Sequence, residues 1–348
     1  MALWQRKYFL EAQSPMIHFQ PNQEGATLRA TEVKPKLDRY LWQRLGEIPP
    51  EWRIPGQERA LNYKLRFYAL EPDTKNPAIP LGRGTPYDIY WANMGNRSPK
   101  MGIRRNAEMT VICLIPELAE IIDRYIGDFF IAHNFGTMQD KGFGSFVVEG
   151  KERTSARVSQ VLRETYQAKC CYCFHIRSQE AAFSRIKRLY YIMKSGLSRE
   201  KQASLLFSYM NKKRIGNEKD WLKQKGLVPT RGRGPQNPQD GRDPHYVRAL
   251  LGVTKQLRFK GTVVNISNSK IDRLASPIFF KIIDNEVYYV GRRLEKEIYG
   301  AAFSFSGYGS KKGTLTVPSR EQLGEGFIDD FLEYCFNALQ SKFSIKKV

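Results

Sequence analysis

Three glycines and one lysine lie close together in the segment FGTMQDKGFGSF, residues 135–146. Gly136, Gly142 and Gly144 would let backbone N–H groups approach a phosphate chain closely, and Lys141 would add positive charge there. A tight turn between a helix and a strand would account for the same glycines. The segment matches neither GxxxxGK[ST] nor a GxGxxG that follows a strand and opens a helix, so it predicts no nucleotide-binding loop.

A second group of chemically active side chains lies in the segment CCYCFH, which contains Cys170, Cys171, Cys173 and His175. Such a cluster raises the question of a zinc site. Structural zinc sites usually combine two ligand pairs, and the sequence offers no second CxxC or HxxxH pair. We therefore expect buried thiols and no metal.

The other titratable residues suggest no catalytic site. His18, His133 and His245 are scattered, and no motif sets a Ser or Cys nucleophile beside them. Asp38 and Asp140 are the carboxylates nearest the basic segments, yet neither belongs to a recognisable catalytic loop. We assign no catalytic residue and no cofactor.

Net charge is the strongest indication of a ligand. The 348 residues include 56 Lys and Arg against 35 Asp and Glu, a net charge of +21 at pH 7. Residues 151–250 hold 22 of these cations and 8 of the carboxylates, a net charge of +14. This excess predicts a polyanionic partner. Nucleic acid is favoured over a membrane surface, because the sequence has neither an apolar run near 20 residues nor a clean basic amphipathic helix.

The N-terminal residues and the cysteine count bear on the compartment. Met1 to Lys7 lack the apolar core of a signal peptide, and five cysteines cannot all pair among themselves. We expect a reduced, cytoplasmic protein.

Hydrophobic spacing predicts the elements that would position these residues. The order strand, helix, strand, strand, helix, strand predicts a ferredoxin-like domain over residues 1–150. Residues 71–107, rich in Pro and Gly, are expected to form a long loop. The predicted elements are strands at 7–19, 61–70, 108–115 and 145–149, a helix opened by Pro35 and ended by Gly46, and a helix that starts at Pro116.

The rest of the chain is expected to form an insertion and a second domain. Residues 151–245 predict a basic helical insertion that ends in an apolar-poor linker, and residues 246–348 predict a second ferredoxin-like domain. The fold class is thus α+β, with two ferredoxin-like, RRM-like domains. Strands are expected at 256–265, 276–283 and 286–291, with a hairpin turn at Asp284-Asn285 and a helix at 325–340.

Three segments together resemble the RAMP superfamily, the CRISPR effector subunits that bind RNA. The segment at 135–146 resembles that family's glycine-rich loop, and SPMIHFQPNQEGATLRATEVKPKLDRYL resembles its first strand and first helix. RLASPIFFKIIDNEVYYVG is similar to strands of the two-domain subunit at the head of type III-B complexes. The resemblance implies an antiviral ribonucleoprotein in which this chain contacts the guide RNA.

The resemblance also implies which residues would touch RNA. The first helix would contact the guide backbone, although a merely solvated helix face would look the same. Lys64, Arg66 and Tyr68 alternate with apolar residues, so they form either an RNA-facing surface, on which bases could stack, or an ordinary exposed strand. The predicted RNA-binding residues are Arg29, Lys34, Lys36, Arg39, Lys64, Arg66, Tyr68, Lys141, Gly142, Phe143 and Gly144.

Together these features predict a structural subunit that binds guide RNA within a multi-subunit effector complex. The target RNA is a second candidate ligand, and other effector subunits are expected partners. The alternative is a metal-independent endoribonuclease that processes guide precursors, for which His18 is the candidate base. A basic scaffold that binds only proteins is a third reading.

Overall fold

The structure, a computed structural model, mixes helices with several small antiparallel sheets and confirms the α+β class. His18 and Gly25 lie outside the described residues, as does most of the expected linker. Among the described residues, no helix has the length and apolar composition needed to cross a bilayer. The structure describes residues 3–17, 28–70, 78–81, 85, 87, 100–197, 200–229, 242–259, 262–307 and 311–348.

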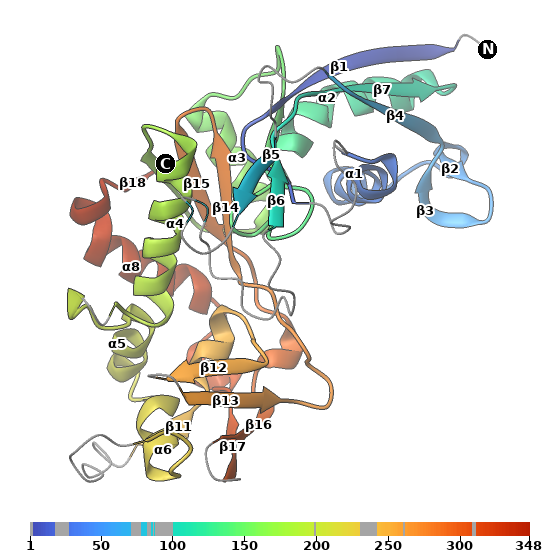
Figure 1. Cartoon of the computed structure of the whole chain (residues 1–348). Helices are drawn as coiled ribbons and strands as arrows, with labels where there is room; N and C mark the ends of the chain where they lie inside the picture. The colour runs from blue at the N-terminus through green and yellow to red at the C-terminus, as the bar shows by residue number, and fades with distance from the viewer. Residues whose placement is uncertain are drawn as a thin grey trace.

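The first sheet has the strand order β4-β7-β1-β8, and each neighbouring pair is antiparallel. Helices α1 and α2 pack against one of its faces (Figure 1). The chain order of these elements is the one predicted for residues 1–150. Their bounds are β1 (Trp4–Ala12), α1 (Ala30–Leu45), β4 (Tyr63–Ala69), β7 (Ala107–Cys113), α2 (Pro116–Ala132) and β8 (Phe146–Val148).

Alternation along the strands gives this sheet two unlike faces. On β1, Tyr8 and Leu10 are buried against the helices. Lys7, which precedes Tyr8, and Phe9, which lies between the two, are exposed. Successive side chains of a strand point to opposite faces, so one face builds a core and the other meets solvent.

Helix α1 starts earlier than the sequence predicts. Pro35 was expected in its first turn, but the helix begins at Ala30 and Pro35 lies inside it. A proline there cannot donate to the carbonyl four residues earlier, and the structure places Pro35 on an exposed surface of the helix. Gly46 ends the helix as expected, with φ of 74°.

The stretch 71–107 is not the uninterrupted loop that was predicted. Its described parts include the antiparallel pair β5 (Ala78–Leu81) and β6 (Lys100–Ile103). Met16 bridges to Ile103, so this hairpin continues alongside the chain that follows β1. A second small hairpin, β2 (Arg53–Ile54) and β3 (Gln57–Leu61), precedes β4.

The second sheet has the order β14-β15-β9-β18 and is also antiparallel throughout. One of its inner strands, β9, comes from the segment predicted to be a helical insertion. The sheet therefore takes strands from both sides of the domain boundary expected at residue 246. The elements are β9 (Cys171–His175), α4 (Gln179–Lys194), β14 (Ile278–Ile283), β15 (Glu286–Gly291), α8 (Phe327–Phe343) and β18 (Lys346–Lys347).

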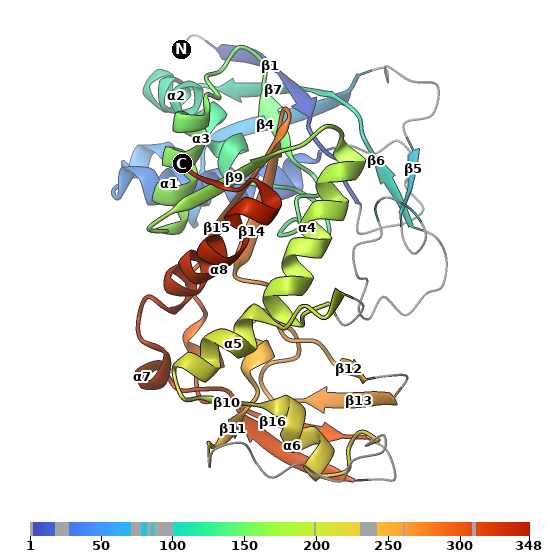
Figure 2. The ribbon, with the colours of Figure 1, turned by 90° about the vertical axis from the view of Figure 1, so that its left-hand side faces the viewer.

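Smaller elements lie at the far end of the molecule from the first sheet (Figure 2). A third antiparallel sheet has the order β12-β13-β16-β17, and β10 pairs with β11 beside it. The strand predicted at 256–265 is divided between β12 and β13. These elements are α5 (Leu205–Lys212), β10 (Gly216–Asn217), α6 (Glu218–Gln224), β11 (Pro244–His245), β12 (Gln256–Phe259), β13 (Thr262–Ser267), β16 (Ala302–Ser306), β17 (Lys312–Thr316) and α7 (Arg320–Leu323).

The second sheet is buried on both faces. Cys171 and Val290 on one face join the core of the first sheet and its helices, including α3 (Ser155–Tyr166). Tyr172 and Tyr289 on the other face belong to a second core with α4 and α8. Of these two sheets, the first therefore keeps an uncovered face among its described strands, whereas the inner strands of the second are covered on both sides.

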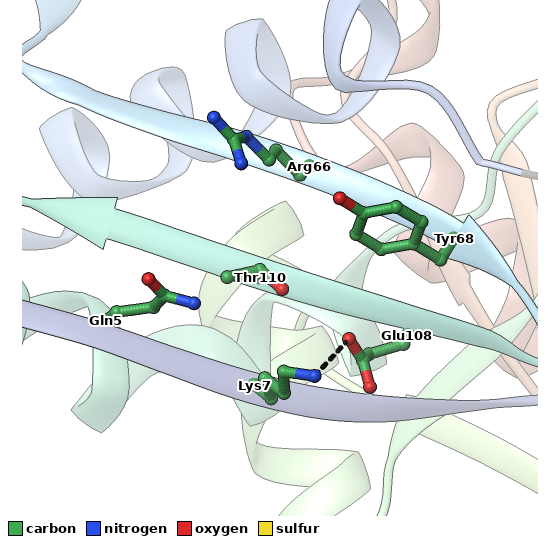
Figure 3. A pocket seen from close by; sticks show the side chains of 6 residues that line it. All are labelled: Gln5, Lys7, Arg66, Tyr68, Glu108 and Thr110. Carbon is green, nitrogen blue, oxygen red and sulfur yellow. Dashed lines mark ion pairs between the residues drawn. The ribbon is translucent and has the colours of Figure 1, made fainter.

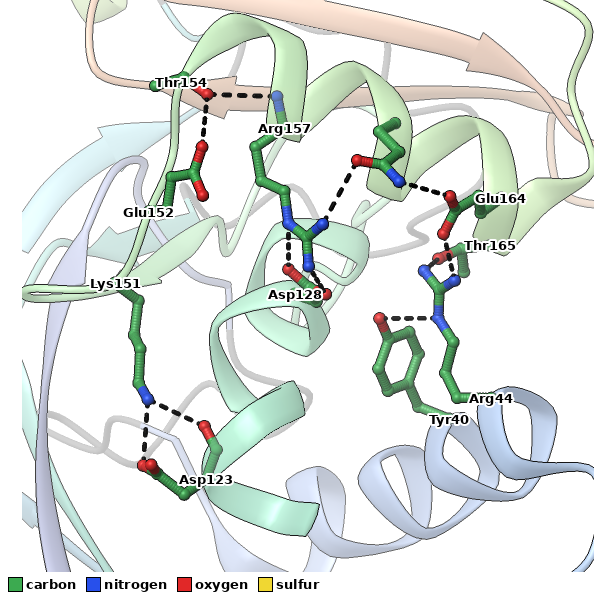
Figure 4. A network of polar contacts seen from close by, with 11 residues as sticks. Tyr40, Arg44, Asp123, Asp128, Lys151, Glu152, Thr154, Arg157, Glu164 and Thr165 are labelled. Carbon is green, nitrogen blue, oxygen red and sulfur yellow. Dashed lines mark hydrogen bonds and ion pairs between the residues drawn. The ribbon is translucent and has the colours of Figure 1, made fainter. Parts of the chain in front are cut away.

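A network of charged side chains fixes α3 against α1 and α2 (Figure 4). Arg157 contacts both carboxylate oxygens of Asp128, at 3.0 and 2.5 Å. Arg44 of α1 lies 2.5 Å from the carboxylate of Glu164. Such paired contacts fix the orientation of the helices as well as their spacing.

Candidate functional site

The uncovered face of the first sheet is a regular grid built by three adjacent strands. The strand register sets one residue of β1 and one of β4 opposite each residue of the central strand β7. Three rows therefore run across the strands. They are Gln5–Ile112–Lys64, Lys7–Thr110–Arg66 and Phe9–Glu108–Tyr68.

The middle row is cationic. Lys7 and Arg66 lie on either side of Thr110, and the Lys7 side chain is 58% exposed. Its ammonium lies 3.0 Å from the Glu108 carboxylate. Among the residues that the structure describes, Arg66 and Lys64 have no carboxylate partner. These rows border a shallow pocket, lined by Gln5, Lys7, Arg66, Tyr68, Glu108 and Thr110 (Figure 3).

The third row is aromatic. Phe9 and Tyr68 are 46% and 54% exposed, although side chains of this size are usually buried. Leu3 and Leu114, also more than half exposed, adjoin the opposite end of the same face. Four of the five large apolar side chains that are exposed among the described residues therefore lie on or beside this face. Such clustering marks a binding surface.

The chemistry of the grid suits a flat, anionic ligand. Lysine and arginine provide donors and charge for phosphate or carboxylate groups, and exposed rings provide flat surfaces for stacking. Lys64, Arg66 and Tyr68, which were predicted from alternation, lie together here.

The cations predicted at the first helix differ in their exposure and in their hydrogen-bond partners. Lys34 donates to Asp38 and to the carbonyl of Leu61, each at 2.8 Å, so its charge is already used inside the domain. Burial raises the pKa of Asp38, and the neighbouring ammonium opposes that shift. Arg39 is exposed and Arg29, at the start of the helix, is partly so.

Lys36 ties α1 to the glycine-rich segment. Its ammonium lies 3.0 Å from Oε1 of Gln139 and 3.1 Å from the carbonyl of Asn134, and burial lowers its pKa. The N–H of Gly136 donates to Glu32 at 2.8 Å. The helix and the segment are thus neighbours.

The end of the glycine-rich segment is buried, which corrects the expectation that Lys141 lies at the surface. The Lys141 ammonium lies 3.1 Å from the ring centroid of Tyr190, is inaccessible to solvent, and has a pKa that burial holds well below its ordinary value. Phe143 is fully buried, 4.3 Å from the ring of Phe183. A phosphate could contact neither the Lys141 ammonium nor the Phe143 ring unless this segment moved away from its neighbours.

Gly142 and Gly144 make the packing of this segment possible. Both have positive φ, 87° and 67°. A Cβ on Gly144 would lie 1.8 Å from the carbonyl oxygen of Phe135, so the position accepts only glycine. The glycines therefore serve a tight join between α2 and β8, the alternative reading weighed from the sequence.

The predicted residues consequently fall into three groups. Lys64, Arg66 and Tyr68 occupy the uncovered face, and the α1 residues lie on the helix side of the first sheet. The segment 141–144 packs instead against α4 and β14. Sequence reasoning missed Lys7 and Phe9, although both lie within the strand expected at 7–19. The alternation of Lys7 and Phe9 with the buried Tyr8 and Leu10 was the signal for them.

Cys171, Cys173 and His175 of the cysteine cluster lie on the inner strand β9, and Cys170 directly precedes it. Cys171 and Cys173 point to one face of the second sheet, and burial raises their pKa values to about 12 and about 11. Within the described ranges, no three His, Cys, Asp or Glu side chains gather as a metal site would require.

The remaining titratable candidates are engaged in packing. Rings of Tyr40 and Phe129 contact His133, whose pKa burial lowers to about 3. Asp140 forms an ion pair with Arg292. His133 is thus neutral over the physiological range, and its Nδ1–H donates to the Phe129 carbonyl oxygen 3.0 Å away.

Comparisons with known proteins agree on one family. The family model of the Cmr1 N-terminal domain matches residues 5–197, and that of the Cmr1 C-terminal domain matches residues 201–347. No curated protein matches the chain.

Two solved structures are similar to parts or all of the chain. The crystal structure of Cmr1 from Pyrococcus furiosus in its apo form is 10% identical, with a TM-score of 0.44, over 100% of this chain and 98% of that one. A chain from a cryo-EM structure of the type III-B Cmr-beta bound to cognate target RNA is 13% identical, with a TM-score of 0.32. That match covers 43% of this chain and 60% of the other. Both TM-scores lie below 0.5, so these two likenesses add nothing to the argument.

Proposed function

Because the chain belongs to the Cmr1 family, we propose that it is a structural subunit that binds RNA within a type III-B CRISPR effector complex. Its RNA ligand is the guide, with the target strand as a second candidate, and its protein partners are the other effector subunits. The subunit would act in the cytoplasm.

The uncovered face of the first sheet is the observation that carries the proposal. It combines two cations without carboxylate partners among the described residues, Lys64 and Arg66, with the exposed rings of Phe9 and Tyr68. Phosphate contacts supply affinity for nucleic acid, and aromatic side chains supply surfaces for bases. A chain with a net charge of +21 adds long-range attraction for RNA.

A ferredoxin-like frame for both halves is part of the proposal. In chain order, the four strands are β1, β4, β7 and β8 in the first unit and β9, β14, β15 and β18 in the second. The sheet orders β8-β1-β7-β4 and β18-β9-β15-β14 then both place the first strand between the fourth and the third. Helices α1 and α2 in one unit, and α4 and α8 in the other, occupy the two connections that this frame requires. The second unit would then begin at β9, with residues 195–275 inserted after α4.

The helix side of the first sheet is a second contact region in this proposal. Arg29, just before α1, and Arg39 on α1 would touch the guide backbone, as the family resemblance implies. Both side chains reach solvent, unlike the ammonium of Lys141. Conversely, contact at Lys141, Gly142, Phe143 and Gly144 would need that segment to open.

The experiment measures RNA affinity over a salt series. Guide RNA should bind the parent chain, with affinity falling by roughly 10³ between about 50 and 200 mM salt if about six phosphates are neutralised. Lys7→Glu with Arg66→Glu should weaken binding at low salt by at least about tenfold and lower the salt slope by about two.

Lys270→Glu with Lys296→Glu is the matched control, because both side chains are exposed and lie away from the first sheet. Its affinity should fall much less than that of the face variant. Equal loss in both variants, or no RNA binding by the parent, would contradict the proposal. Shortening of the RNA during incubation would instead indicate a nuclease.

A further inference from the structure

The three rows of the uncovered face have spacings that can be derived from sheet geometry. Neighbouring strands lie about 4.8 Å apart, so Phe9 and Tyr68, two strands apart in one row, have backbones about 10 Å from each other. Successive rows on one face are two residues apart along a strand, or about 7 Å. The aromatic row therefore runs parallel to the cationic row of Lys7 and Arg66 at that distance.

Charge divides the rows into distinct roles. Glu108 lies between the two rings, so a phosphate placed on the aromatic row would meet a carboxylate. The neighbouring row presents Lys7 and Arg66, and the next presents Lys64. An RNA strand on this face would therefore run across the β-strands, with its backbone along the cations and its bases over the rings.

Stacking on isolated rings requires bases whose faces are uncovered. In a duplex each base is already stacked on its neighbours, and only the phosphates and groove edges remain accessible. Phe9 and Tyr68 protrude from a sheet and belong to no loop that could enter a groove. Their geometry suits unpaired bases alone.

We infer that this face binds single-stranded RNA through two unpaired bases, one stacked on Phe9 and one on Tyr68, with the backbone between them on Lys7 and Arg66. The inference rests on the proposed function, since it specifies the form of RNA that the same face accepts. The cationic rows favour RNA over an apolar protein surface as the occupant, although Leu3 and Leu114 lie at the far end.

The test compares aromatic variants on two RNAs, a short single-stranded RNA and the same strand annealed to its complement. Phe9→Ala with Tyr68→Ala should weaken single-strand binding by at least about 30-fold and leave the weaker duplex binding nearly unchanged. Phe9→Tyr with Tyr68→Phe keeps both rings and serves as the control, which should bind within about twofold of the parent. Phe9→Leu with Tyr68→Leu keeps apolar bulk without rings and should resemble the alanine variant.

The outcomes separate this inference from the proposed function. If the parent binds no RNA, the proposed function itself fails. If Lys7→Glu with Arg66→Glu weakens binding but the alanine variant does not, or if the duplex binds as tightly as the single strand, the stacking inference fails and the proposed function stands. Alanine variants that keep RNA affinity but no longer join the other effector subunits would make the face a protein contact, which also overturns the inference.

Discussion

The ammonium of Lys281 lies 2.6 Å from the carbonyl oxygen of Phe130, joining β14 of the second sheet to the last turn of α2. The same ammonium also reaches the carbonyl oxygens of His133 and Phe146 and Oδ1 of Asn134, at 2.9 to 3.2 Å. A cation at a helix C-terminus meets carbonyls that lack partners within the helix. Lys281 thus links the two cores at a point without access to solvent.

Lys281→Met should lower the free energy of unfolding by about 2–4 kcal/mol, because it leaves several buried carbonyl groups without a donor. Urea denaturation would measure the loss. Lys270→Met is the control, since Lys270 is exposed and its replacement should change stability by less than about 0.5 kcal/mol. Equal stability of the two variants would show that the Lys281 contacts add nothing.

His133 should make the protein less stable in acid. Its pKa is about 3 in the folded chain and about 6.5 when unfolded, so the unfolded state takes up the proton first as the pH falls. The stability that this neutral histidine provides is present above about pH 6.5 and is lost as the pH falls toward 3. Between pH 7 and pH 5 the free energy of unfolding should drop by up to roughly 2 kcal/mol from this group.

The variant His133→Phe isolates this effect, because a phenyl ring keeps the contacts with Tyr40 and Phe129 but cannot titrate. Urea denaturation at both pH values should show a smaller difference for the variant than for the parent. An identical pH dependence would assign the acid sensitivity to other groups.

Gly144 and Gly150 both have positive φ, 67° and 73°, yet only Gly144 has close neighbours. Gly144→Ala should cost more than about 3 kcal/mol, because the new Cβ would overlap the Phe135 carbonyl. Gly150→Ala should cost only about 1–2 kcal/mol, the cost of the left-handed conformation itself. Urea denaturation of the pair checks this difference, and comparable losses would mean that the backbone moves aside at Gly144.

Arg39 and Lys141 should respond differently to charge reversal. Lys141→Glu puts a carboxylate against the ring of Tyr190 and beside Asp140, so the melting temperature should fall by at least about 5 °C. Arg39→Glu should leave it nearly unchanged and weaken RNA binding, since Arg39 is exposed on α1. Thermal unfolding and RNA affinity of the two single variants test this, and a stable Lys141→Glu variant would contradict the burial.

The cysteine strand should carry no structural zinc. Zinc ligation requires thiolates, and burial raises the pKa of the Cys171 thiol to about 12. Elemental analysis of the purified chain is expected to find far less than one zinc per chain. A stoichiometric metal content would overturn this prediction.

Elements whose signal is local were predicted well from the sequence. The spacing of apolar residues identified α2 and α8, and Asp284-Asn285 identified the hairpin of β14 and β15, where Asp284 has φ of 51°. Alternation identified β4 and its exposed Lys64, Arg66 and Tyr68. Helical period, turn chemistry and strand alternation are properties of a few neighbouring residues, so the sequence determines them directly.

The partners of those elements were decided by the tertiary structure. The strand β9 lies between helices in the sequence, and only its pairing with β15 and β18 makes it an inner strand. Lys141 looks like a surface cation in the sequence, but the packing of α4 and β14 over it buries its ammonium. Likewise, Lys7 and Phe9 join Arg66 and Tyr68 only through β7, which follows β4 by about 40 residues. Pairing and burial depend on contacts between segments far apart in the chain, and local patterns contain no information about which distant segment will supply them.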